Sequence, residues 1–127
     1  MSITASLTGN ITLVDSVVGN QALIKSIASL IFTGTNSSYA NSQNIGTSPT
    51  TITLPISPTK FVYIKNLHAS NTLTVTWTPN GGASNPVVTL QTSEALLFVG
   101  SNTSGGITAL SLTASGASTP VEFILAG

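Results

Sequence analysis

The clearest hydrophobic pattern in the chain lies between residues 60 and 78. An apolar run, Phe61–Ile64, is followed by the polar link His68–Asn71 and then by a stretch in which Leu73, Val75 and Trp77 alternate with threonines. Alternation with period two among β-branched and aromatic residues is typical of a strand, and a short polar link of this kind favours a turn. We therefore predict a β-hairpin over residues 60–78, at the centre of an all-β domain.

Three further apolar stretches occupy the N-terminal part of the chain. Ser2–Thr8 alternates strictly, which predicts an edge strand or an N-terminal arm. It ends at Gly9 and Asn10, and a hairpin across these two residues would pair it with Ile11–Val18. Gln21–Thr33 fits helical spacing about as well as strand spacing. Because strand-like runs surround it, we interpret Gln21–Thr33 as a strand.

The most polar stretch of the chain is Thr35–Thr50. It predicts a long surface loop that Tyr39 and Ile45 pin to the body of the domain. Such a loop is a candidate contact surface, and a passive connector is an equally good interpretation. Thr51–Ile56 then predicts a short strand, and Pro55 within it indicates a sheet edge or a bulge.

The rest of the chain repeats strand-like runs separated by Gly, Pro, Asn and Ser. The predicted strands are Pro86–Gln91, Ser93–Val99, Ile107–Thr113 and Val121–Ala126. In total, about eight to ten short strands recur every ten residues or so, which indicates an antiparallel β-sandwich or a small barrel. No linker divides the chain, so we expect a single domain over residues 1–127, with residues 1–9 as a candidate N-terminal arm.

Charge is unusually scarce. Charged residues make up 5% of the chain and the net charge is zero, whereas about 25% is typical of globular domains. Solubility therefore depends on Ser, Thr and Asn, and little charge repulsion opposes self-association. We expect a subunit of an assembly in preference to a monomer with a hydroxyl-rich coat. Three lysines and no arginine argue against nucleic-acid binding and against a polybasic membrane patch.

Site chemistry is equally sparse. The chain has no cysteine, and its single histidine, His68, is predicted to be an exposed turn residue. Asp15, Glu94 and Glu122 are far apart in sequence, so a carboxylate pair for glycoside hydrolysis is a weak alternative. We predict no catalytic residue, no metal ligand and no cofactor. The N-terminus lacks the basic and apolar regions of a signal peptide, so we expect synthesis in the cytoplasm without a cleaved leader.

Aromatic residues offer a second kind of site. Trp77 and Tyr63 could form a platform for stacking a sugar, but their central strands favour burial in the core. Tyr39, in the polar stretch, is the better candidate for an exposed aromatic. The threonines of Thr72–Thr78 are typical of a solvated sheet face, with an ice-binding array as a minor alternative.

Several segments resemble small virion structural proteins of tailed bacteriophages. They are FVYIKNLHASNTLTVTW with the Gly-rich turn after it, VVTLQTSEALLFVG and the terminal VEFILAG, together with Ile24-Lys25-Ser26 and Gly46-Thr47 upstream. Where that family carries Pro-Gly before its Glu-Ala step, this chain has Thr92-Ser93. The resemblance implies a β-sandwich of the jelly-roll kind, located in the virion as a capsid decoration, tail or collar component whose partners are viral capsid or tail proteins.

These observations leave three functional hypotheses. The leading one is a non-enzymatic, homo-oligomeric structural subunit of a virus particle, whose candidate interface residues are Ile3, Ala5 and Leu7 in the arm and Tyr39 in the loop. Unguarded sheet edges are ready interfaces for such contacts. The second is a carbohydrate- or receptor-binding β-sandwich module, favoured by an exposed Tyr39 or Trp77 beside a groove. The third, a hydrolase, requires two carboxylates or His68 in one pocket.

Overall fold

The structure is a computed structural model that describes residues 3–14, 22–100 and 105–127, and for residues 3–14 and 22–33 it describes the strands and their pairing. All regular elements of these described residues are strands. They are β1 (Ile3–Val14), β2 (Ala22–Gly34), β3 (Ser37–Ile45), β4 (Thr50–Thr51), β5 (Phe61–Asn66), β6 (Leu73–Pro79), β7 (Val87–Leu90), β8 (Ala95–Val99), β9 (Ile107–Ala114) and β10 (Thr119–Ala126).

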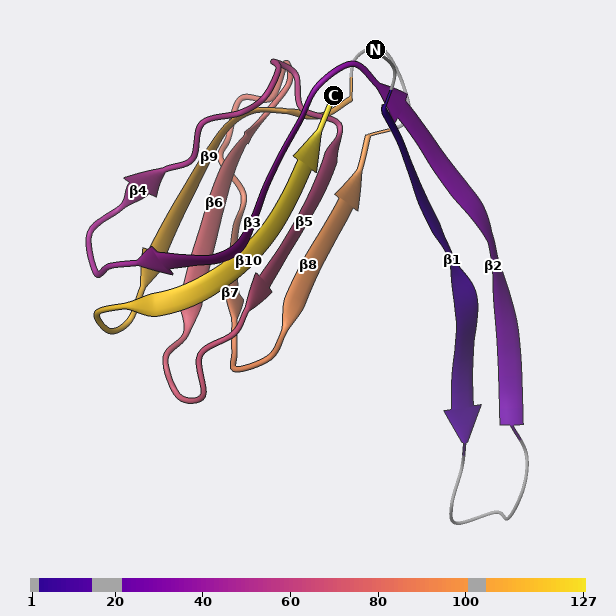
Figure 1. Ribbon diagram of the computed structural model, residues 1–127, viewed down its shortest axis with the longest axis horizontal. Coiled ribbons are helices and arrows are strands. Elements are labelled where there is room, and N and C mark those ends of the chain that lie inside the picture. Colours follow the sequence, from indigo (N-terminus) through magenta and orange to yellow (C-terminus); the bar gives the residue numbers. More distant parts are fainter. Residues whose placement is uncertain (1–2, 15–21, 101–104) are drawn as a thin grey trace.

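Eight of the strands form two antiparallel sheets that pack face to face (Figure 1). The β5 sheet has the order β3-β10-β5-β8, and the β6 sheet has the order β4-β9-β6-β7. Pairing is nested from the outside inward: β3 with β10, β4 with β9, β5 with β8 and β6 with β7. A long antiparallel hairpin that is rolled up on itself produces this order, which is the topology of a jelly roll. The predicted all-β sandwich is confirmed.

The core lies between the two sheets and follows the period-two pattern of the strands. Along β5, buried and half-buried positions alternate without exception, so that Val62, Ile64 and Asn66 face inward. β10 alternates in the same way from Thr119 to Phe123. The inward positions of both sheets make one continuous cluster of Ile45, Ile52, Val62, Ile64, Leu73, Val75, Leu90, Ile107, Leu110, Leu112, Ala114, Val121, Phe123 and Leu125.

A single buried amide joins the two sheets at one end of the sandwich. Asn66, at the end of β5, is fully buried. Its side-chain nitrogen donates to the carbonyl oxygens of Asn71 at 2.8 Å, Gln91 at 3.1 Å and Leu90 at 3.3 Å, and its side-chain oxygen accepts from the His68 backbone nitrogen at 3.0 Å. Because these partners lie in the link before β6, at the last residue of β7 and just after it, Asn66 holds the chain as it passes from one sheet to the other.

The predicted hairpin over residues 60–78 is wrong. Both strands exist, but β5 pairs with β10 and β8, whereas β6 pairs with β9 and β7. The polar link at His68–Asn71 does turn the chain, as expected, yet it crosses between the sheets. An Asn- and Ser-rich turn serves a crossover as well as a hairpin, and here the buried Asn66 amide makes the crossover the stable choice.

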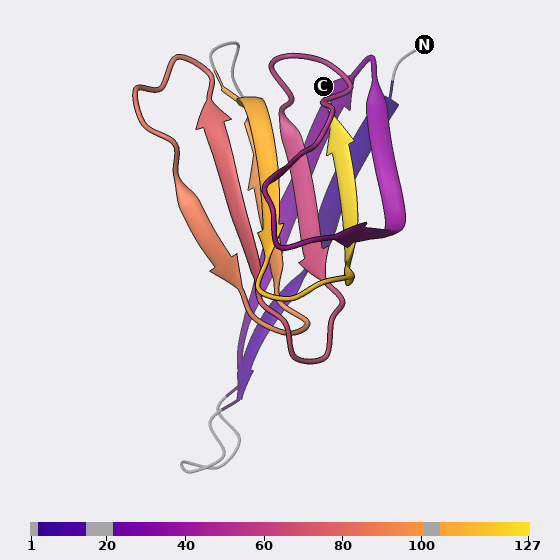
Figure 2. The same ribbon diagram turned by 90° about the vertical axis from the view of Figure 1, so that its left-hand side faces the viewer.

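The N-terminal strands form a separate two-stranded ribbon, and the predicted hairpin across Gly9–Asn10 is also wrong. β1 continues through both residues and pairs along its length with β2, so the interpretation of Gln21–Thr33 as a strand is confirmed. The end of the predicted run Ile11–Val18, from residue 15 onward, lies outside the described residues. Figure 1 shows the ribbon on the outer side of the β5 sheet, diverging from β8, and in Figure 2 the ribbon lies behind the sandwich.

A β-bulge explains part of the helix-like spacing of apolar residues in β2. Between Leu7 and Gly9 of β1 the register shifts: Leu7 lies opposite Leu30, but Gly9 lies opposite Ile27. Ile27 and Leu30 are three residues apart, as on a helix face, and the extra residue of the bulge brings both to the same face of the ribbon. One ribbon face therefore carries Ile3, Ala5, Leu7, Gly9, Ile11 and Leu13 opposite Gly34, Phe32, Leu30, Ile27, Lys25 and Leu23, respectively.

Two further expectations about loops and strands are corrected. The predicted loop Thr35–Thr50 contains the nine-residue strand β3, and the predicted strand Thr51–Ile56 is reduced to the two-residue β4. β3 lies at the edge of its sheet, where one pairing partner suffices and polar side chains stay in solvent. Ile45 is fully buried and pins this segment as expected, whereas Tyr39 is 72% exposed and does not.

The Asn66 amide yields a stability prediction. We expect Asn66→Ala to lower the free energy of unfolding by about 2–4 kcal/mol, because it leaves several buried or half-buried backbone groups without their partner. Urea denaturation measures this change, with Asn44→Ala on the exposed edge strand as a control that stays within about 0.5 kcal/mol of the parent. Equal stabilities for the two variants would contradict the role assigned to Asn66.

Candidate functional site

The most distinctive surface is a row of apolar side chains across the outer face of the β5 sheet. The strand register places Tyr39 of β3 opposite Ile124 of β10, Ile124 opposite Tyr63 of β5, and Tyr63 opposite Leu97 of β8. Tyr39 is 72% exposed, Ile124 44% and Leu97 41%. Phe61 and Val99, half-buried neighbours in register, extend this surface toward the root of the ribbon. We call these six residues the apolar face.

The apolar face results from the fixed inward positions of the strands. Val62 and Ile64 are buried, so Phe61 and Tyr63 must lie on the opposite side of β5. In β8, Leu96 and Phe98 pack against the core, which turns Leu97 outward. The expectation that Tyr63 is buried in the core is therefore wrong. An uninterrupted apolar run such as Phe61–Ile64 fills both faces of its strand and does not reveal which face is the inner one.

Charge on this face is neutralised within the face itself. Glu122 lies opposite Lys65 in register, where opposite charges attract. Glu122 also accepts a hydrogen bond from the Tyr63 hydroxyl. Burial raises the pKa of Tyr63 above its ordinary value of 10.0, and the hydrogen bond and negative charge of Glu122 raise that pKa further. The face therefore presents aromatic and aliphatic groups with no net charge.

The outer face of the β6 sheet has the opposite character. Its register aligns Thr51, Ser111, Thr76 and Val87 in one row across four strands, and Thr113, Thr74 and Thr89 in the next. The sequence indicated threonines on β6 alone, and the pairing extends the pattern to β4, β7 and β9. We call these seven residues the hydroxyl face. Its side chains hydrogen-bond readily with water, so the two outer faces of the sandwich differ sharply in affinity for solvent.

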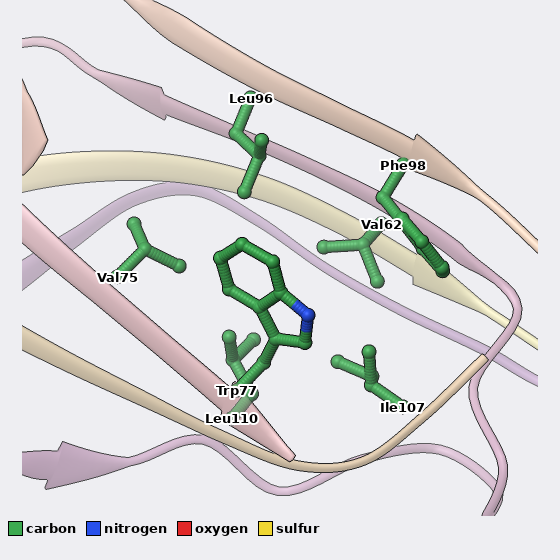
Figure 3. A pocket seen from close by; sticks show the side chains of 7 residues that line it. All are labelled: Val62, Val75, Trp77, Leu96, Phe98, Ile107 and Leu110. Atoms are coloured by element: carbon green, nitrogen blue, oxygen red, sulfur yellow. The ribbon is translucent and has the colours of Figure 1, made fainter. Parts of the chain in front are cut away.

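The interior offers a void too small for a ligand. A wholly apolar cavity of about 10 Å³ lies between the sheets, with the Trp77 side chain among its walls (Figure 3). A cavity must reach about 10–15 Å³ and offer polar partners before it holds even one water molecule. Trp77 is half-buried and packs against the core, as expected. The lining residues are Val62, Val75, Trp77, Leu96, Phe98, Ile107 and Leu110.

The titratable residues that the structure describes do not converge on a reaction centre. His68 uses Nδ1 to accept from the backbone nitrogens of Asn71 at 2.8 Å and Ser70 at 3.0 Å, which is a turn-stabilising role. Glu94 accepts from the Gln91 backbone nitrogen at 2.7 Å, at the β7–β8 turn. Asp15 lies outside the described residues. Within the described ranges, no three His, Asp or Glu side chains gather as a metal site would require.

The predicted interface residues fall on two separate parts of the molecule. Ile3, Ala5 and Leu7 all lie in β1, on the same face of the ribbon. Tyr39 lies on β3 beside an open hollow of about 350 Å³. The walls of this hollow also include Asn41, Glu122 and Ile124. The sequence identified Tyr39 as exposed but missed the row that it begins, because the row joins strands that are distant in the chain.

Comparison with known proteins returned no match: no protein-family model, no curated protein and no solved structure is similar to this chain. The described residues also contain no helix of the length and apolarity that crossing a membrane requires. Function must therefore be argued from the two faces and the ribbon.

The shifted pKa of Tyr63 yields a pH prediction. A folded-state pKa above the unfolded value stabilises the protein fully below about pH 10, and that contribution disappears as the pH rises through the folded-state pKa. We expect the urea midpoint to fall between about pH 9 and pH 11 more steeply in the parent protein than in Tyr63→Phe, which retains the ring but not the hydroxyl. Identical slopes for the two proteins would refute this assignment.

Proposed function

We propose that this chain is a non-enzymatic structural subunit of a virus particle, most directly a capsid decoration protein that binds the shell and like subunits through apolar and sheet-edge contacts. The apolar face supports this proposal most strongly. Tyr39, Ile124 and Leu97 expose 72%, 44% and 41% of their surface on one sheet face. Large exposed apolar patches on soluble proteins mark interaction sites or cause aggregation.

The scarcity of charge strengthens the argument. Three basic and three acidic residues leave little electrostatic repulsion to keep such a face apart from another molecule. A neutral apolar surface gains its binding free energy from the area removed from water, which suits a permanent contact within a particle. The resemblance to virion structural proteins and the jelly-roll topology agree with this role, although jelly rolls also serve as lectin domains.

The hollow beside Tyr39 favours a second candidate, a carbohydrate- or receptor-binding module. The exposed ring of Tyr39 could stack on a sugar, and the side-chain oxygens of Asn41 and Glu122 could accept hydrogen bonds from the sugar hydroxyl groups. A glycan screen tests this candidate directly. Specific binding that Tyr39→Ala abolishes, in a protein whose solution mass is unchanged, would select the module over the structural subunit.

Location in a particle is tested by co-assembly. The chain is produced together with the structural proteins encoded beside its own gene, and assembled particles are purified through a density gradient. A decoration subunit stays with the particle at a constant ratio to the shell protein. Complete loss into the soluble fraction would contradict the proposed role.

Contact through the apolar face yields a matched mutational prediction. Leu97→Thr and Ile124→Thr each place a residue that suits a strand but remove apolar contact area. The lost area weakens the free energy of association by about 1–1.5 kcal/mol. We expect either substitution to weaken self-association about tenfold, as measured by light scattering across a concentration series. Val87→Thr is the control, because Val87 is 61% exposed on the hydroxyl face and its loss should change nothing. Equal effects of all three substitutions would refute a specific apolar interface.

A further inference from the structure

The ribbon and the apolar face have complementary properties within one chain. One face of the ribbon is mainly apolar and carries a single charged residue, Lys25, because the bulge brings Ile27 of β2 onto the same face as Leu30. The opposite ribbon face is mixed and less apolar, because its pairs are Thr4 with Thr33, Ser6 with Ile31, Asn10 with Ser26, Thr12 with Ile24 and Val14 with Ala22. A ribbon of two strands is at best marginally stable in water by itself and needs a surface to pack against.

The ribbon does not lie flat on its own sandwich. Its root is fixed by backbone hydrogen bonds: the nitrogens of Thr35 and Asn36 donate to the Gly127 oxygen at 2.7 and 3.0 Å, and the Gly127 nitrogen donates to the Asn36 oxygen at 3.0 Å. From this root the ribbon runs on the outer side of the β5 sheet and diverges from β8 (Figure 1). Closing onto its own sheet would require the ribbon to swing about these bonds.

From these observations we infer that the ribbon of one subunit packs its apolar side on the apolar face of a second copy. The ribbon of the second copy packs in the same way on the apolar face of the first. The occupant of the apolar face is thus the β1–β2 ribbon of a two-fold-related subunit. This inference rests on the proposed assembly role and specifies how like subunits join.

The area of the contact favours a reciprocal exchange. Two strands of twelve or thirteen residues make a ribbon about 40 Å long and about 10 Å wide, with a face of about 400 Å². Docking one such face removes about 800 Å² from water over both partners, which is below the roughly 1,000 Å² expected of a biological interface. Two reciprocal contacts remove about 1,600 Å², the size of a stable interface. A two-fold arrangement is also the commonest symmetry of homo-oligomers.

The chemistry of the two surfaces is compatible with this docking. On the apolar face Lys65 lies opposite Glu122, and Glu122 is hydrogen-bonded to Tyr63, so no unpaired carboxylate would be buried beneath the ribbon. The hydroxyl face offers no comparable surface, because its two rows are Thr and Ser with the single exception of Val87. Of the two outer sheet faces that the structure describes, the apolar face is therefore the one that suits the ribbon.

Single-cysteine variants test the contact in the full chain. The protein has no cysteine, so Leu30→Cys in the ribbon and Leu97→Cys in the apolar face each carry one thiol. Under oxidation, a mixture of the two should yield a disulfide-linked heterodimer in large excess over the mixture of Leu30→Cys with Thr76→Cys on the hydroxyl face. Ile124→Cys replaces Leu97→Cys if the latter is unfolded by circular dichroism.

Each other outcome is informative. Linkage only between two copies of Leu97→Cys would mean face-to-face packing and overturn the exchange while retaining the structural subunit. In the double variant Leu30→Cys/Leu97→Cys, a disulfide formed within a monomer would mean that the ribbon closes on its own sheet, which also overturns the exchange. A discrete oligomer by light scattering without any ribbon-to-face linkage would do the same. A monomer at every concentration would overturn both this inference and the proposed contact between like subunits.

A pair of neighbouring substitutions separates the two ribbon faces. Leu7→Asp places a charge on the apolar ribbon face, and Ser6→Asp places the same charge on the opposite face. We expect Leu7→Asp to raise the dimer dissociation constant at least tenfold and Ser6→Asp to leave it within twofold. Equal effects would refute docking through the apolar ribbon face.

Discussion

The packing of two sheets on one shared core fixes the direction of every side chain in the sandwich. Once Val62 and Ile64 of β5 and the inward residues of β10 fill the space between the sheets, the residues between them must lie outside. The outward set on the β5 sheet is Tyr39, Ile124, Tyr63 and Leu97, and on the β6 sheet it is threonine and serine. The contrast between the two outer faces is therefore a direct consequence of the core.

The ribbon is subject to a different constraint. It has two faces but no second layer of its own, so it cannot bury apolar surface as the sandwich does. Its bulge is needed because β2 would otherwise place Ile27 and Leu30 on opposite sides. With the bulge, Ile27 and Leu30 share the face of Leu7, whereas Ile24 and Ile31 lie on the other face. The two-stranded ribbon therefore has no core of its own.

Local patterns in the sequence predicted the strands well and their partners poorly. The alternation of Leu73, Val75 and Trp77 identified β6, and the burial of Ile45 was expected correctly. The pairing of β5 with β10 depends on contacts between residues distant in the chain, which no local pattern reveals. The apolar face was missed for the same reason, since its row exists only after four strands are aligned. β3 was missed because an edge strand tolerates the polar residues of a loop.

The hydroxyl face has a consequence for how such a molecule meets its surroundings. Its Thr and Ser side chains bind water as neutral donors and acceptors, and neither salt nor moderate pH changes alter them. A particle that turned this face outward would carry a coat indifferent to ionic strength and without attraction for charged surfaces. Such a coat would keep particles dispersed equally well in dilute and in saline media, without the charged residues on which most soluble proteins depend.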